Sequence, residues 1–205
     1  KAIILDVEAT PLSRPAEVDS TKTMIDRVES KFAIRPQRLM GDMAYGAAPM
    51  LGWLVDDRGI EPHVPVWDKS QRKDDSFSVS DFEWCPDDDE YRCPGGKTLR
   101  HFRRQFAKPR TGITKDNTKI YKASKADCDV CPLKPRCCPN TPARKIARSI
   151  FEDARDTARR ICQTLIYQHS RYERKKVEML FAHLTTILKV DRLRLRGLTG
   201  ANDEF

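Results

Sequence analysis

The run Leu-Met-Gly-Asp-Met-Ala-Tyr-Gly at residues 39–46 places one carboxylate, Asp42, where an apolar strand pattern gives way to a glycine-containing turn. Far along the chain, Glu178 lies in a helical pattern that is rich in basic residues. Two carboxylates that converge from a strand end and a helix can hold divalent metal for phosphoryl transfer. The first chemical prediction is therefore a metal-dependent site that uses Asp42 and Glu178.

Each carboxylate also has a simpler structural interpretation. An aspartate after a strand often caps a turn or the following helix, and Asp42 meets that description. Glu178 follows Arg174 by four residues, which is the spacing of an ordinary ion pair on a helix surface. Spacing alone favours both simpler interpretations, so other features must decide.

The sequence around Glu178 predicts an amphipathic helix that packs on a sheet. Its apolar stripe consists of Val177, Leu180, Phe181, Leu184, Ile187 and Leu188. On a neighbouring face, Arg171 and Arg174 precede Glu178 by about two turns and one turn of helix. Arginines at those positions could hold phosphate beside a metal that the glutamate binds.

The elements that would position these residues alternate between strands and helices. β-Branched and aliphatic runs predict strands, and periodic apolar residues predict helices. The predicted strands cover residues 2–9, 38–42 and 60–67, and the predicted helices cover residues 16–32, 47–57 and 143–188. The last helical stretch divides into two helices near residues 167–170. Strand, helix, strand, helix and strand in this order indicate an α/β sheet.

A separate module follows the third predicted strand, because six of the seven cysteines lie within residues 85–138. Two of them have the C-x2-C spacing, and another precedes a Pro-Gly-Gly turn that would present its sulfur. The spacing selects four thiolates for a closed tetrahedral zinc site, which are Cys93, Cys128, Cys131 and Cys137. Such a site would organise a loop-rich segment that has no apolar core of its own.

Other states of these cysteines stay open. The thiols could be unliganded, or they could form disulfides, which are rare in the cytosol where we expect this chain. Cys138 is adjacent to Cys137 and would be spare, Cys85 is a weaker ligand candidate, and Cys162 is most simply a core residue. His63 and His183 are interpreted as structural rather than catalytic.

The bulk properties fit a nucleic-acid partner. The chain has 205 residues, of which 39% are hydrophobic and 33% charged, and a net charge of +8. Residues 134–196 contain 16 Lys/Arg and 6 Asp/Glu, a balance of +10, whereas the rest has 22 and 24, a balance of −2. A concentrated basic region suits a polyanion such as DNA, or is simply a solvated helical face. No signal peptide or membrane-spanning run is visible, so no membrane partner is expected.

Six segments occur in one order along nearly the whole chain, and their combination is more specific than any one of them. They are residues 4–10, 41–46, 91–97, 128–132, 174–184 and 191–197. Together they resemble the C-terminal part of bacterial insertion-sequence transposases of the DDE type, which have a ribonuclease-H-like catalytic core. The resemblance reverses the simpler interpretations of Asp42 and Glu178.

In that family three acids bind two Mg²⁺ or Mn²⁺ ions, which activate the attacking water or DNA 3′-hydroxyl and stabilise the leaving oxygen. By resemblance Asp42 is the second acid and Glu178 the third. The first acid would lie on a strand that precedes Lys1, and Asp6 is a poor replacement. We therefore expect an impaired portion of a transposase, because two carboxylates bind a metal pair poorly.

The family's helix signature of Tyr, Arg, Glu and Lys is met only in part. Arg174 fits, but Arg171 stands where tyrosine is expected and Thr185 where a phosphate-binding lysine is expected. Lys189 could substitute for that lysine. The resemblance implies DNA at insertion-sequence ends as the partner and a homo-oligomer of the full-length protein. The expected DNA-binding residues are Arg171, Arg174, Lys175, Lys189, Arg192 and Arg194.

The resemblance implies three parts of an α/β fold, a partial ribonuclease-H-like mixed sheet with flanking helices and a small cysteine-rich insertion. Residues 1–68 would form the N-terminal part of the core, residues 69–142 the insertion, and residues 143–205 the helical part that carries Glu178. The alternative function is a non-catalytic, zinc-containing module that binds DNA or protein through its basic helices.

Overall fold

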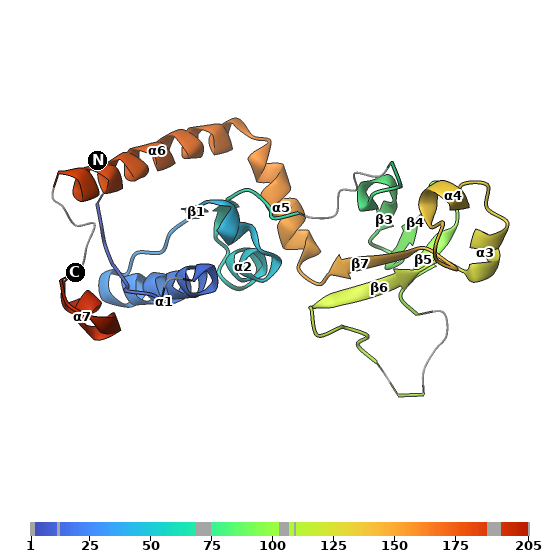
Figure 1. The fold of residues 1–205 in the computed structure, drawn as a ribbon, viewed down its shortest axis with the longest axis horizontal. Helices are drawn as coiled ribbons and strands as arrows, with labels where there is room; N and C mark the ends of the chain where they lie inside the picture. The colour runs from blue at the N-terminus through green and yellow to red at the C-terminus, as the bar shows by residue number, and fades with distance from the viewer. Residues whose placement is uncertain are drawn as a thin grey trace. The chain divides into compact units, whose positions relative to one another are not determined.

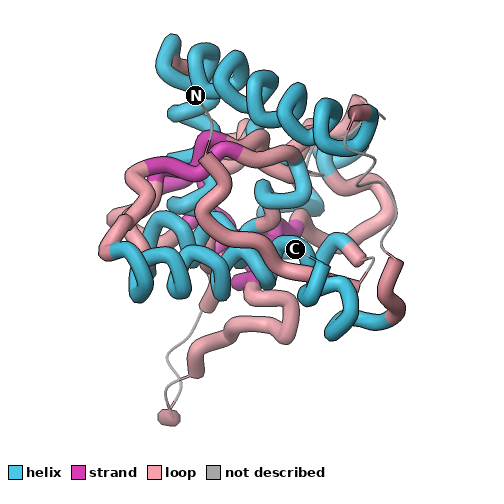
Figure 2. Tube along the Cα trace, turned by 90° about the vertical axis from the view of Figure 1, so that its left-hand side faces the viewer, coloured by secondary structure: helices cyan, strands magenta, loops and turns pink. Residues whose placement is uncertain are grey.

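The structure of the chain, a computed structural model, divides into two compact units. Unit 1 comprises Lys1–Trp67 and Asp153–Phe205, and unit 2 comprises Asp68–Glu152. The structure describes residues 3–11, 13–68, 75–102, 107–108, 110–187 and 194–204. Figure 1 labels the helices and strands, and Figure 2 shows that helices and loops make up most of the trace while the strands are short. The architecture is mixed α/β, as the sequence predicts.

The first part of unit 1 alternates helices with two short parallel strands. Its elements are the helix α1 (Arg14–Phe32), the strand β1 (Arg38–Met40), the 3₁₀ turn η1 (Met43–Gly46), the helix α2 (Ala48–Gly52), the π-helical turn η2 (Trp53–Asp57) and the strand β2 (Glu61–His63). β1 and β2 pair in parallel, and Met40 lies opposite His63. The four predicted elements in this region are confirmed in kind, although both strands are shorter than predicted.

Local sequence explains where these elements begin and end. Ser13 caps α1, because its Oγ accepts a hydrogen bond from the backbone N–H of Ala16 at 3.4 Å. After η2, Gly59 adopts a φ of +63°, a left-handed conformation that costs glycine little and that places β2 beside β1.

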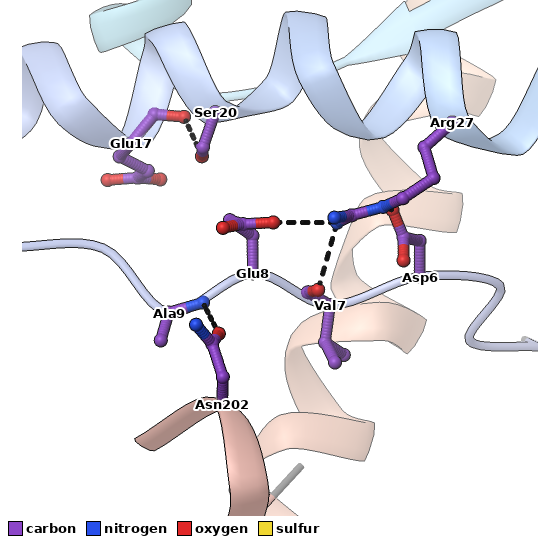
Figure 3. Close-up of polar contacts among 8 residues, drawn as sticks. All are labelled: Asp6, Val7, Glu8, Ala9, Glu17, Ser20, Arg27 and Asn202. Carbon is purple, nitrogen blue, oxygen red and sulfur yellow. Dashed lines mark hydrogen bonds and ion pairs between the residues drawn. The ribbon is translucent and has the colours of Figure 1, made fainter. Parts of the chain in front are cut away.

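The prediction of a strand at residues 2–9 is wrong for its described part. Residues 3–11 pair with no strand of the described chain, and Ile3 is 80% exposed. Side chains hold this segment instead: Arg27 of α1 binds the carboxylates of Asp6 and Glu8, each at 2.7 Å (Figure 3). The aliphatic pattern is that of a strand, but a strand also needs a neighbour to satisfy its backbone.

The second part of unit 1 is helical. It contains α5 (Glu152–Cys162), α6 (Leu165–Thr186) and α7 (Gly197–Glu204). The break between α5 and α6 falls a few residues before the predicted one. Thr164 determines it, because its Oγ1 accepts a hydrogen bond from the N–H of Tyr167 at 3.2 Å and caps α6.

The apolar stripe of α6 is not covered along its second half, contrary to the prediction that it packs on a sheet. Phe181 is 55% exposed and Ile187 is 60% exposed, while Leu188 lies outside the described residues. The described sheet of unit 1 has only two strands, and α6 packs along β1 and reaches β2 through the contact of Ser170 with His63. The stripe therefore extends past the sheet edge.

The core of unit 1 forms around α2 in two small clusters. One contains Leu51, Val64, Ala154 and Ala158, and the other contains Met50, Leu54 and Ile60. Leu39 and Tyr45 pack against both clusters. Tyr45 lies in η1, the turn that Asp42 begins, and its packing anchors this turn to the core of unit 1.

Gly46 also constrains this turn, and its surroundings predict how a substitution there would change stability. A Cβ at this position would lie 1.9 Å from the backbone oxygen of Pro65 and 2.8 Å from the N atom of Trp67. Backbone atoms cannot move aside as side chains do, so Gly46→Ala is expected to destabilise unit 1 by about 3 kcal/mol. Thermal or urea unfolding measures this change. Gly59→Ala is the comparison, because it meets no atom within 4 Å and carries only the strain of its φ of +63°, so it should cost less, about 1 kcal/mol.

Unit 2 is an antiparallel meander. Its strands are β3 (Glu83–Cys85), β4 (Glu90–Arg92), β5 (Thr98–Arg100), β6 (Thr118–Lys122) and β7 (Lys145–Ser149), in that order across the sheet. A 3₁₀ turn, η3 (Val79–Asp81), precedes the sheet, and the short helices α3 (Lys125–Asp129) and α4 (Lys134–Cys137) lie between β6 and β7. The predicted helix from residue 143 is therefore wrong over β7, where Ile146 and Arg148 alternate inward.

The prediction that the cysteine module has no apolar core is also wrong. Phe82, Tyr91, Leu99, Tyr121 and Ile146 form one buried cluster. The rings of Tyr91 and Tyr121 meet edge to face, with centroids 5.5 Å apart. These residues are far apart in the sequence, so no short pattern shows that the sheet brings them together.

Among the helices in the described ranges, none combines the length and the apolar composition that crossing a membrane requires.

Candidate functional site

Asp42 lies directly after β1, at the start of η1. Its Oδ1 accepts a hydrogen bond from the backbone N–H of Ala44 at 2.8 Å, so the turn-capping interpretation is confirmed. The side chain is exposed, and the cap uses one oxygen of the carboxylate. A carboxylate held by its own turn is pre-oriented for a ligand, because its rotamer is already fixed.

Glu178 lies on α6 and forms the expected ion pair with Arg174, whose Nε is 2.9 Å from Glu178 Oε1. The same guanidinium also reaches outside the helix. Its Nη1 donates a hydrogen bond to the backbone oxygen of Gly41 at 2.8 Å. Arg174 therefore joins the Glu178 carboxylate to the backbone of Gly41, the residue that precedes Asp42.

Two further contacts of unit 1 reach the strand β2 and the residue after it. His63, the last residue of β2, shares a hydrogen bond with Ser170 of α6, with 2.7 Å between Nδ1 and Oγ. The thiol of Cys162, at the end of α5, donates to the backbone oxygen of Val64 at 3.3 Å. Burial raises the pKa of the Cys162 thiol, which stays protonated and able to donate at neutral pH.

The basic residues predicted to bind DNA differ in their surroundings. Arg171, Lys175 and Arg194 are exposed, whereas Arg174 is half-buried in the contacts described above. Lys189 and Arg192 lie outside the described residues. At the position where the family has lysine, the Thr185 hydroxyl donates to the backbone oxygen of Ala182 at 3.0 Å.

Asp6 is bound elsewhere. Its carboxylate and that of Glu8 flank Arg27, whose pKa rises through these two hydrogen bonds (Figure 3). Both acids lie on the side of the segment that faces Arg27. Within the residues that the structure describes, no group of three or more His, Cys, Asp or Glu side chains is placed to hold a metal ion.

The cysteines of unit 2 nevertheless converge on one small cavity of about 30 Å³. Five sulfur-bearing residues line it, which are Cys93, Cys128, Cys131, Cys137 and Cys138. A Cβ placed on Gly95 would lie 3.7 Å from Cys93 Sγ and 3.6 Å from Cys131 Sγ, so these two sulfurs face the same glycine. The cavity has room for one particle of about the size of a water molecule.

Backbone geometry presents the sulfurs to this cavity. The N–H of Lys97 donates to Cys93 Sγ at 3.3 Å across the turn between β4 and β5. The N–H of Cys131 donates to the backbone oxygen of Cys128 at 3.3 Å, which folds the C-x2-C segment into a turn.

Without a metal, the thiols of Cys128 and Cys137 have raised pKa values and are protonated at neutral pH. Burial, followed by the neighbouring Cys138, raises the pKa of Cys137 to about 11. Burial also raises the pKa of the Cys128 thiol, which is hydrogen-bonded to Cys138. All seven cysteines are free, so the disulfide interpretation finds no support in the structure.

Two residues that the structure brings into these contacts, Ser170 and Cys138, have no predicted role in a site. No feature of the sequence marks Ser170, and only the fold shows that it contacts His63. Its position next to Cys137 predicts that Cys138 is spare, yet Cys138 is the more buried of the two and is hydrogen-bonded to Cys128. Cys137 ends α4, Cys138 follows it, and both residues line the cavity.

The comparisons with known proteins give one match. A family model described as "Transposase DDE domain" matches residues 92–205, which is more than half of the chain. No curated protein and no solved structure matches.

Proposed function

Because the chain belongs to the transposase DDE domain family, we propose that it takes part in DNA transposition by metal-dependent phosphoryl transfer, with Asp42 and Glu178 as two of the acids. The matched segment contains Glu178, and Asp42 lies before it. The observation that carries the proposal is the double contact of Arg174, which brings Glu178 to the end of β1 where Asp42 begins its turn.

In this proposal β1, β2 and α6 belong to a ribonuclease-H-like core, with α6 as the late helix that carries the third acid. The two exposed carboxylates would hold Mg²⁺ or Mn²⁺, which when bound supplies a polarised oxygen nucleophile and stabilises the leaving oxygen. Two oxygen ligands suit such hard cations, which keep water in their other positions. Two acids hold a metal pair poorly, so we expect weak phosphoryl transfer by this chain alone.

The residues around the carboxylates would hold the DNA backbone. Arg171 and Lys175 are exposed on α6 within about two turns of Glu178, and Arg194 is exposed farther along the chain. Such side chains bind phosphate without reading sequence. Arg174 would act mainly on Glu178, because its guanidinium is already engaged on two sides.

We also propose a structural zinc ion in the cavity of unit 2, held by Cys93, Cys128, Cys131 and Cys137. The chemistry of the donors supports this, since thiolate sulfur is the preferred ligand of structural zinc. All four residues line one cavity, where an ion would draw the sulfurs together. Cys138 competes with Cys137 for the fourth position.

DNA binding in the presence and absence of metal tests the proposal. Anisotropy of a labelled DNA duplex is measured with and without Mn²⁺. We expect Mn²⁺ to tighten DNA binding several-fold, because a cation between the carboxylates and a phosphate joins the two. Glu178→Gln should lose this tightening and keep the basal affinity.

Glu173→Gln is the matched control, because Glu173 lies on the same helix and pairs with Lys176 at 2.6 Å. It should respond to Mn²⁺ as the unmodified chain does. If Mn²⁺ leaves the DNA affinity of the unmodified chain and of both variants unchanged, the alternative of a non-catalytic binding module is favoured.

A further inference from the structure

One face of α6 is attached to the ends of both parallel strands. Ser170, Arg174 and Glu178 are spaced by four residues, so they lie on that face about 6 Å apart along the helix axis. The first contacts His63 at the end of β2, and the second contacts Gly41 just after β1. The third is the proposed metal ligand.

The contact between Ser170 and His63 is buried on both sides. Each residue is 3% exposed, and 2.7 Å separates Ser170 Oγ from His63 Nδ1. On its other side, His63 Nε2 lies 3.4 Å from Glu61 Oε2. Serine, histidine and glutamate in this order have the composition of a nucleophilic triad, but a hydroxyl this deeply buried cannot meet a substrate. The group is therefore a structural contact.

Strand register places the two contacts side by side. Met40 lies opposite His63 in the parallel pair, and Gly41 follows Met40. The Ser170 and Arg174 contacts are thus one helical turn apart on α6 and reach the same end of neighbouring strands. A helix held at two such points can neither rotate about its axis nor slide along it without breaking one contact.

We propose that Ser170 and Arg174 are positioning residues, which set the rotation of α6 so that Glu178 faces the turn of Asp42. This inference rests on the proposed function of Asp42 and Glu178. A metal site loses affinity when its ligands move by fractions of an ångström, because each cation requires a narrow range of distances. Outer contacts that orient ligands are typically worth 10- to 100-fold in metal affinity.

The test compares two ways of weakening α6. Ser170→Ala removes the hydroxyl that bonds His63, and Thr164→Ala removes the cap of the same helix without touching His63. Mn²⁺ affinity is measured by calorimetry well below the unfolding temperature of each variant. We expect Ser170→Ala to lose about 10-fold in affinity and Thr164→Ala to stay within about 2-fold.

Arg174→Lys is a second, independent variant. It keeps a cation beside Glu178 but offers one nitrogen in place of the Nε and Nη1 that reach two different acceptors. It should also lose about 10-fold. Ser170→Thr, which retains the hydroxyl, should recover part of the loss that Ser170→Ala shows.

The possible outcomes distinguish a failure of the positioning role from a failure of the proposed metal site. Equal losses in Ser170→Ala and Thr164→Ala, or no loss in either, would overturn the positioning role while leaving the metal site in place. If the unmodified chain binds Mn²⁺ no better than Glu178→Gln, the proposed function fails first, and the inference fails with it.

Discussion

Asp42→Asn is expected to weaken Mn²⁺ binding by about 100-fold or more, because it removes the charge of one of two carboxylate ligands. The substitution is chosen to spare the fold. Asparagine keeps the Oδ1 that accepts from the N–H of Ala44, so η1 keeps its cap. Isothermal titration of the chain with Mn²⁺ measures the loss.

The same titration distinguishes a shared site from two separate ones. If Asp42 and Glu178 bind one ion, either single substitution removes most of the affinity, and the double variant adds little. If they bind separately, each single variant keeps the other half of the binding. Asp57→Asn is the control for an exposed aspartate of unit 1. Full Mn²⁺ affinity in Asp42→Asn would contradict the assignment.

Loss of zinc is expected to be the largest stability effect in unit 2. With free zinc at about 1,000 times its dissociation constant, the bound ion would stabilise the unit by about 4 kcal/mol. Cys131→Ser should abolish the binding of one zinc ion per chain and lower the free energy of unfolding by that amount. Atomic absorption gives the metal content, and thermal unfolding with and without a chelator gives the stability.

Cys85→Ser is the matched control for this experiment. Cys85 belongs to the same unit, in β3, and does not line the described cavity. It should retain zinc and stability. The sheet should survive zinc removal in every variant, because its aromatic core is already buried without the ion, whereas the turns of α3 and α4 should lose order. If the purified chain contains no zinc, and added zinc changes neither its metal content nor its unfolding temperature, the proposed site is contradicted.

What the sequence predicts well are elements with local causes. α1 and α2 follow from periodic apolar residues, prolines and caps, and β1 follows from the short aliphatic run before Gly41. Each of these features is decided within one or two turns of chain.

What the sequence misses depends on distant partners. Residues 3–9 have the composition of a strand but pair with none, and the segment at Lys145 reads as helical until β6 pairs with it residue by residue. At the site, the i, i+4 spacing shows that Arg174 can reach Glu178. Only the packing of α6 on β1 shows that it also reaches Gly41.

The most direct test of the account is cleavage of the polypeptide by bound iron. Fe²⁺ occupies carboxylate sites that take Mg²⁺ or Mn²⁺, and with ascorbate and peroxide it generates hydroxyl radicals that cut the nearby backbone. One ion held by Asp42 and Glu178 predicts two cuts in the same chain, one near residue 42 and one near residue 178. Both cuts should disappear in Asp42→Asn and persist in Asp57→Asn. Cuts at only one of the two segments, or cuts that survive Asp42→Asn, would contradict a shared metal site.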